Sequence, residues 1–226
     1  DHRDLHLSLR RQRQMCIRDS LEVMVAEACE GLEGTNAQNI IDEANKNLYD
    51  GVTEEDARTS LVMTSRTLVE QEPNYTYVTA RILLDNIRTE ALSYLGMQKQ
   101  ATQKEMEGLY PQALRNFLAK GVENEILNPE LLEMDIEKLG QAIDSSRDTE
   151  FTYLGLQTLY DRYFIHDTEI RYELPQVFFM RVSMGLALRE DNREDRAIEF
   201  YNLLSSFDYM SSTPTLFNSG TKHSQL

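Results

Sequence analysis

The sequence predicts a mainly α-helical fold with one short β-hairpin, and three observations lead to that prediction. Apolar residues recur at helical spacing through most of residues 21–207. Helix starts are marked by capping residues, such as Thr53 and the pair Asn128-Pro129. Residues 163–172 alone place two β-rich runs around a polar turn, which is the pattern of a hairpin.

The first four helices are expected at residues 21–32, 36–49, 54–70 and 75–95. Thr53 caps the third helix, whose acidic first turn suits the helix dipole, and Pro73 ends it. In these helices the apolar residues recur at helical spacing, and most are expected to face inward. They are Val23, Val25, Ala26, Ala28, Ile40, Ile41, Ala44, Leu48, Leu61, Val62, Leu68, Val69, Ala80, Leu84, Ile87, Ala91 and Leu95.

Five further helices are expected at residues 102–120, 129–139, 148–163, 175–188 and 193–207. The hairpin at 163–172 interrupts this helical series. From residue 210 the chain is rich in Ser, Thr, Asn and Gly around Pro214, which predicts a loop or a short extended segment to residue 226.

The charge balance argues against several classes of partner. The chain has 38 Asp and Glu against 23 Lys and Arg, a net charge of −15. Such a chain is repelled by phosphate backbones and anionic lipid, so no nucleic-acid or membrane partner is expected. No apolar run is long enough to span a bilayer. The two cysteines, Cys16 and Cys29, fit a reducing compartment, and a cytoplasmic protein is expected.

Residues 1–20 differ from the rest of the chain. They carry five Arg and three Asp, whereas the remainder is strongly acidic. The string at residues 15–20 resembles translated adapter sequence, so residues 1–20 are expected to be foreign to the fold or disordered. A basic arm and a targeting segment are the alternatives. The end of the sequence at Leu226 suggests a truncated chain.

The sequence gives little indication of a metal site or of a catalytic nucleophile. Carboxylate-bridged metal centres in helical bundles need Glu-x-x-His, and none of the four His residues follows an acidic residue at that spacing. No Cys-x-x-Cys pair is present, and no metal site is expected. Cys29 is expected to be a buried structural thiol, and His166 an exposed turn residue. No Gly-rich phosphate loop is present.

One polar segment has the composition of a ligand-binding loop. Residues 211–221 gather hydroxyls, an amide and a glycine around Pro214. Such a segment can offer hydroxyl and backbone N–H groups to a phosphate. On this pattern alone an ordinary turn is the alternative.

The amino-acid sequence of this segment resembles that of a known protein family. Residues 213–221, TPTLFNSGT, with Gln225-Leu226 after them, resemble the stretch before the first active-site cysteine in class I ribonucleotide reductase large subunits. Residues 48–52 (LYDGV) and 73–81 (PNYTYVTAR) resemble the second half of that family's N-terminal ATP-cone. Two further stretches resemble its helical N-terminal domain, and all four matches follow the family's order. Those two stretches are residues 148–159 (DTEFTYLGLQTL) and 174–185 (LPQVFFMRVSMG).

The resemblance implies a domain plan for residues 21–226. Residues 21–96 correspond to a partial, helical ATP-cone and residues 97–209 to the N-terminal helical domain. Residues 210–226 begin the substrate loop of a ten-stranded α/β barrel, which lies beyond this chain. Arg58 and Thr89 stand where the family often has a His-type nucleotide contact and a Lys, so no ATP contact is assigned.

The resemblance also implies an activity, an oxidoreductase that makes deoxyribonucleotides for DNA synthesis. Ribonucleoside diphosphates are reduced by thiyl-radical chemistry, with a Ser-Ser-Cys expected right after Leu226. No catalytic residue lies within the chain, which is expected to be inactive alone. Thr213 and Thr215 match the hydroxyl positions of the substrate diphosphate site.

The implied partners are a metal-containing small subunit that supplies the radical, thioredoxin or glutaredoxin, and a second large subunit in a homodimer. The chain itself is expected to bind no cofactor, while ATP and dATP are candidate allosteric effectors. The alternative reading is an acidic, all-helical protein-interaction module without catalysis.

Overall fold

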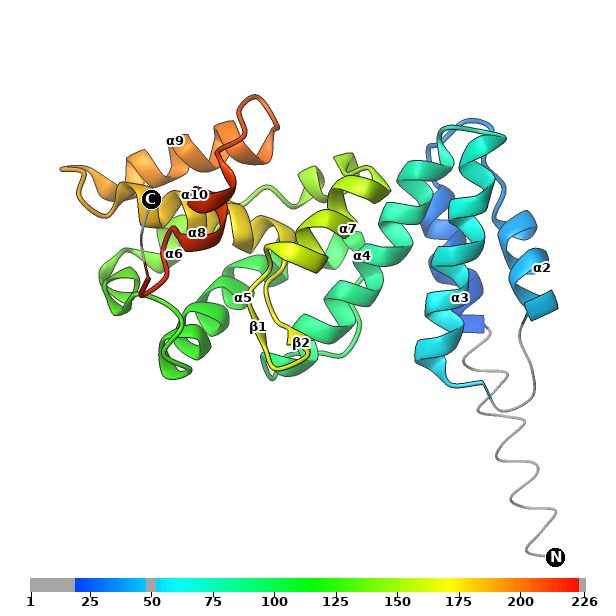
Figure 1. Cartoon of the computed structure of the whole chain (residues 1–226), viewed down its shortest axis with the longest axis horizontal. Coiled ribbons are helices and arrows are strands. Elements are labelled where there is room, and N and C mark those ends of the chain that lie inside the picture. The colour runs from blue at the N-terminus through cyan, green and yellow to red at the C-terminus, as the bar shows by residue number, and fades with distance from the viewer. Residues whose placement is uncertain (1–18, 48–51, 224–226) are drawn as a thin grey trace, which may run out of the picture. The chain divides into compact units, whose positions relative to one another are not determined.

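The computed structural model describes residues 19–47 and 52–223, and it confirms the mainly helical fold with a short hairpin (Figure 1). Residues 19–29 form the first helix. The labelled α-helices are α2 (Ala37–Asn47), α3 (Glu54–Thr67), α4 (Tyr75–Tyr94), α5 (Gln103–Glu123), α6 (Ile136–Gln141), α7 (Tyr153–Arg162), α8 (Pro175–Ala187), α9 (Arg193–Ser205) and α10 (Thr213–Asn218). The 3-10 helices are η1 (Leu68–Glu70), η2 (Pro129–Glu133) and η3 (Ser145–Glu150).

The predicted hairpin is present. Strands β1 (His166–Asp167) and β2 (Ile170–Arg171) pair antiparallel, with His166 opposite Arg171. His166 is exposed, as expected, and its Nδ1 lies 3.1 Å from the carbonyl oxygen of Thr168 within the turn.

The chain divides into two compact units. One contains the described residues up to 86 together with 151–154, and the other contains 87–150 with 155–223. The division falls within α4, whose predicted apolar stripe is buried along its whole length. The domain boundaries expected at residues 20, 96 and 209 stay predictions. Residues 1–18 and Leu48 lie outside the described residues, whereas residues 19 and 20 already belong to the first helix.

The core of the first unit follows the predicted helical spacing for most residues, although Leu68 and Val69, expected to face inward, are only half-buried in η1. Thr53 caps α3 as expected, because its hydroxyl accepts a hydrogen bond from the Asp56 N–H at 3.1 Å. The expectation that Val23 belongs to the apolar stripe is wrong: 68% of its surface is exposed. Ala26 is exposed as well, since only every third or fourth residue of the first helix faces inward. The inward-facing residues are Leu21, Val25 and Ala28.

Two predicted helices of the second unit are each divided in two. The pattern at 129–139 becomes η2 followed by α6, because the Asp135 side chain accepts a hydrogen bond from the Lys138 N–H at 3.0 Å and starts a new helix. The pattern at 148–163 likewise becomes η3 followed by α7. At α6, a short polar side chain that caps a new helix interrupts the continuous apolar pattern in this way.

Helix α8 lies at the centre of the second unit and is buried on nearly all sides. It starts with Pro175 at its first turn, where the missing N–H leaves no hydrogen bond unmade. Phe178 and Phe179 are fully buried and their rings meet edge to face at 5.1 Å. A helix that is apolar all round is expected in the interior of a domain.

The expectation of a loop or extended segment at 210–226 is wrong for its central part. Residues 213–218 form α10, whose position in the fold is visible in Figure 1. Ser212 occupies the N-cap and Pro214 lies in the first turn, where its fixed φ favours a helix start. The composition that predicted a loop therefore marks the beginning of a short helix. Residues 224–226 lie outside the described residues.

None of the helices in the described part of the chain combines the length and the apolar character needed to cross a membrane.

Candidate functional site

Helix α10 brings the two predicted site residues together within one turn. Thr213 is exposed, and its Oγ1 lies 3.1 Å from the hydroxyl oxygen of Tyr163. Thr215 is half-buried, and its Oγ1 lies 3.2 Å from the Oγ of Ser212. The hydroxyls of residues 212, 213 and 215 therefore lie at the start of a short helix, in two separate contacts. Ser212 was not singled out from the sequence, although its place as the residue before Thr-Pro marks it as a helix cap.

The C-terminal half of this segment is held by backbone contacts. Ser219 is fully buried, and its hydroxyl donates to the carbonyl oxygen of Val182 in α8 at 2.7 Å. The Asn128 N–H donates to the carbonyl oxygen of Gly220 at 3.0 Å, and Thr221 forms an isolated antiparallel bridge with Leu127. Buried polar contacts of this kind fix backbone position more tightly than apolar packing alone.

Two glycines allow the segment to lie directly on α8. Gly220 has a φ of +77°, a conformation that side chains with a Cβ rarely adopt. A Cβ on Gly185 would lie 2.1 Å from the backbone nitrogen of Gly220 and 2.4 Å from the Ser219 hydroxyl oxygen. The close approach therefore depends on the absence of a side chain at both positions.

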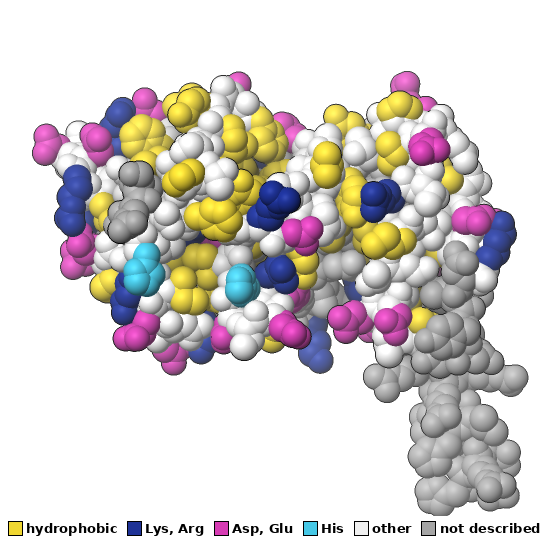
Figure 2. Space-filling view, viewed as in Figure 1, with side chains coloured by type: hydrophobic (Ala, Val, Ile, Leu, Met, Phe, Trp, Pro, Cys, Tyr) yellow, Lys and Arg dark blue, Asp and Glu magenta, His cyan; other side chains and the backbone are white. Residues whose placement is uncertain are grey.

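An aromatic pair and further exposed apolar side chains lie in the region of α9 and α10. The ring of Phe217 lies 4.7 Å from that of Tyr163, measured between centroids, and 42% of Phe217 is exposed. Figure 2 shows hydrophobic side chains gathered over α9 and α10 on the face that it presents. The exposed apolar residues of this region are Leu203, Phe207, Tyr209, Met210 and Phe217.

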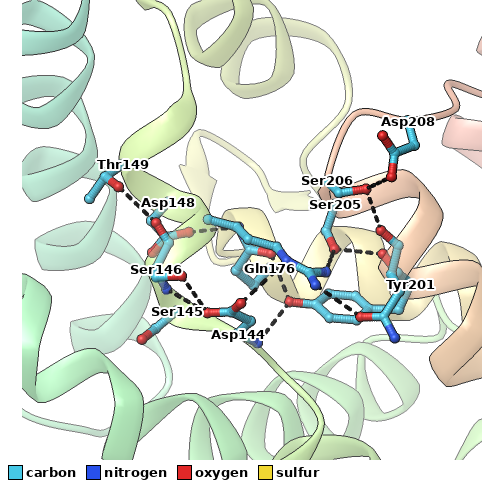
Figure 3. A network of polar contacts seen from close by, with 12 residues as sticks. Asp144, Ser145, Ser146, Asp148, Thr149, Gln176, Tyr201, Ser205, Ser206 and Asp208 are labelled. Carbon is cyan, nitrogen blue, oxygen red and sulfur yellow. Dashed lines mark hydrogen bonds and ion pairs between the residues drawn. The ribbon is translucent and has the colours of Figure 1, made fainter.

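A polar network joins η3 to the start of α8 and the C-terminal half of α9, and Figure 3 shows Asp148, Gln176 and Tyr201 within it. The carboxylate of Asp148 accepts hydrogen bonds from Tyr110 at 2.6 Å, from Gln176 at 2.9 Å and from Arg88 at 3.1 Å. Tyr201 donates in turn to the Gln176 amide oxygen at 2.9 Å. Burial raises the pKa of Tyr201 to about 12, so its phenol stays a neutral donor.

This network has the properties of a structural support. Asp148 is 1% exposed and already accepts three hydrogen bonds, so most of the acceptor sites of its carboxylate are occupied. Its donors come from α4, α5 and α8, and Tyr201 adds α9. A satisfied buried network of this kind stabilises one packing of the helices.

In the first unit, the Arg58 side chain is already paired. Arg58 is 6% exposed, and its guanidinium forms ion pairs with Glu54 at 3.2 Å and with Asp85. Its charge is therefore balanced by two carboxylates. Thr89, the other position compared with the ATP-cone, is half-buried in α4.

The sulfur of Cys29 lies in a half-buried environment, less enclosed than the sequence suggested. Burial raises the pKa of this thiol, although a hydrogen bond from Thr35 and the charge of Arg81 oppose the shift. A raised pKa keeps the sulfur protonated at neutral pH and lowers its reactivity. Within residues 19–47 and 52–223, no group of three or more His, Cys, Asp or Glu side chains is placed to hold a metal ion.

Comparison with known proteins places this chain beside reductase subunits. Residues 149–224 match the family described as "Ribonucleotide reductase, all-alpha domain". The chain is 42% identical to the ribonucleoside-diphosphate reductase subunit alpha of Chlamydia muridarum over 94% of its own length and 20% of the relative's. The corresponding Helicobacter pylori subunit is 31% identical over 88% of this chain and 24% of the relative.

A vertebrate protein gives a similar result. The ribonucleoside-diphosphate reductase large subunit of Danio rerio is 31% identical over 92% of this chain and 25% of the relative. The chain therefore spans only about a fifth to a quarter of the length of these curated relatives.

Proposed function

We propose that the whole protein reduces ribonucleoside diphosphates to deoxyribonucleoside diphosphates, because this chain belongs to the ribonucleoside-diphosphate reductase large-subunit family. In this reaction the 2′-hydroxyl leaves as water, and a pair of cysteine thiols is oxidised to a disulfide. The thiyl-radical cysteine and the reducing pair belong to the protein outside this chain. A metal-containing small subunit supplies the radical, and thioredoxin or glutaredoxin reduces the disulfide again.

Within this reaction, we assign α10 to the binding of the substrate's diphosphate. The observation that carries the assignment is the position of three hydroxyls at the start of α10, where Ser212 contacts Thr215 and Thr213 contacts Tyr163. Hydroxyl groups can donate hydrogen bonds to phosphate oxygens. Such short-range contacts act against the long-range repulsion of anions by the chain's net charge of −15. The anchored residues 219–221 hold the opposite, C-terminal end of the helix in place.

The partners and effectors of the whole protein complete the proposal. Two large subunits form a homodimer in the cytoplasm, and ATP and dATP act as allosteric effectors. Residues 21–96 correspond to part of an ATP-cone. We assign no effector contact to this part, since the Arg58 charge is already matched by Glu54 and Asp85.

The direct test is turnover by the full-length protein. It is incubated with its small subunit, a dithiol reductant and CDP, and dCDP is quantified by chromatography. The proposal predicts dCDP that depends on the small subunit, with a control reaction that omits it. If a small subunit of proven radical content gives no dCDP with any ribonucleoside diphosphate, the reductase assignment is wrong and an interaction module is the remaining reading.

A further inference from the structure

Arg181 is a fully buried cation that contacts the backbone of the α10 segment. Its side chain is 0% exposed and projects from α8. One guanidinium nitrogen, Nη1, donates to the carbonyl oxygen of Ser219 at 2.7 Å and to that of Leu216 at 3.3 Å. These carbonyls lie at the C-terminal end of α10, where helix carbonyls lack intrahelical partners and a positive charge is favourable.

The other side of the guanidinium binds Glu173, which is also 0% exposed. The Nε of Arg181 lies 2.7 Å from Oε1 of Glu173, and Nη2 lies 3.2 Å from Oε2. The second carboxylate oxygen also accepts a hydrogen bond from the Ile165 N–H at 2.9 Å. The pair thus links the start of the hairpin, α8 and the end of α10.

The Arg181–Glu173 ion pair is linked to both ends of α10. Ile165 is two residues after Tyr163, whose hydroxyl contacts Thr213 and whose ring packs against Phe217. Arg181 holds the opposite end of the helix through the Leu216 and Ser219 carbonyls. One buried ion pair is therefore tied to both ends of the helix that carries Thr213 and Thr215.

The chemistry of the pair is suited to positioning more than to stability. A buried ion pair contributes little net stability, because desolvation of the two charges offsets their attraction. The planar guanidinium of Arg181, however, fixes the relative positions of its partners, because it binds a carboxylate on one edge and two carbonyl oxygens on the other. A lysine at this position keeps the charge but cannot satisfy both sides in that geometry.

We propose that Arg181 and Glu173 form a positioning pair that sets the place of α10, and with it the Thr213 and Thr215 hydroxyls, for binding of the substrate's diphosphate. This inference rests on the proposed function of the segment. Neither residue touches the substrate, since both are fully buried. Their effect on binding passes through the backbone of residues 216–219.

The test uses the full-length reductase with its small subunit and compares R181K with R88K. Arg88 is an equally buried partner of a buried carboxylate, Asp148 at 3.1 Å, but its contacts lie on α5 and η3. We expect R181K to raise the KM for CDP about 10- to 100-fold, the order expected when a hydrogen bond to a charged group is lost, with a much smaller change in kcat. We expect R88K to lower the melting temperature and leave KM unchanged.

A second variant covers the case in which R181K does not fold. The double variant R181M/E173Q contains no buried charge, and its glutamine can still accept the Ile165 N–H, so the fold is retained. It lacks the donors to residues 216 and 219. In the full-length protein, this variant is expected to accelerate hydrogen exchange of the amides at 216–221, whereas R88K leaves them unchanged.

The outcomes separate this inference from the proposed function. If T215V raises KM while R181K and the double variant do not, the positioning inference is wrong and the substrate role of α10 stands. If none of these variants changes KM, the substrate role of α10 fails and the inference fails with it. If R181K lowers only stability, as R88K does, the pair is structural and the inference is overturned.

Discussion

Substituting Gly185 with alanine tests the contact between α8 and residues 219–220. The added Cβ would lie 2.1 Å from the Gly220 nitrogen and 2.4 Å from the Ser219 hydroxyl oxygen, both far inside van der Waals contact. The nitrogen belongs to the backbone, which cannot rotate away as a flexible side chain can. The substitution therefore forces the segment that follows α10 to move off α8.

Two opposing effects set the expected size of the change. In the interior of a helix, alanine is favoured over glycine by about 1 kcal/mol. Overpacking a close contact costs about 1–3 kcal/mol, and more where backbone must move. The clash at 2.1 Å belongs to the upper part of that range, so we expect a net loss of about 2 kcal/mol. For a chain of this length, that loss corresponds to a fall in Tm of about 4–8 °C.

The assay is thermal unfolding of the 226-residue chain followed by far-ultraviolet circular dichroism, with G108A as the matched control. Gly108 also lies inside a helix, α5, and a Cβ there would meet nothing within 4 Å. G108A is therefore expected to raise stability by about 0.5–1 kcal/mol. The contact between α8 and residues 219–220 would be refuted if G185A were as stabilising as G108A.

Three further predictions concern the site and the cysteines. In the full-length enzyme, T215V is expected to raise the KM for CDP about 5- to 30-fold, because a hydrogen bond to a charged group worth about 1–2 kcal/mol is lost. An unchanged KM with a lowered melting temperature would assign Thr215 a purely structural role. The 226-residue chain alone, mixed with the small subunit and a dithiol, is expected to give no dCDP, because Cys16 and Cys29 are its only cysteines; measurable product would contradict this. In a C16S background, Cys29 is expected to react with iodoacetamide at pH 8 more slowly in the folded chain than in urea. Burial raises the pKa of the thiol, and the thiolate is the reactive form. Equal rates would show that the thiol is not enclosed.

The sequence predicted most of the helices because their apolar spacing is long and regular. The apolar stripe from Ala80 in α4 to Leu95, directly after that helix, is buried throughout, and the hairpin forms within the predicted residues 163–172. The break between η2 and α6 was missed, because a single capping residue, Asp135, interrupts an otherwise continuous pattern. Local capping competes with periodicity over such short stretches.

The site was predicted only in part. The Thr213 and Thr215 positions came from a resemblance in wording, and the pattern of residues indicated a loop where α10 forms. Arg181 and Glu173 were not recognised, since their pairing depends on the packing of α8 against residues 216–219. A signal was nevertheless present: Arg181 is the only charged residue between Pro175 and Leu188, in a helix that is otherwise almost entirely apolar. A lone charge in such a helix needs a buried partner.

Hydrogen exchange on the full-length protein tests the central claim most directly, namely that the α10 segment binds the substrate's diphosphate. Exchange is measured by mass spectrometry with and without a saturating ribonucleoside diphosphate, with the unphosphorylated ribonucleoside as control. The account predicts slower exchange at residues 212–221 with the diphosphate and no change there with the ribonucleoside, while α5 is unaffected by both. Identical exchange at residues 212–221 with and without a diphosphate that is demonstrably bound would contradict it.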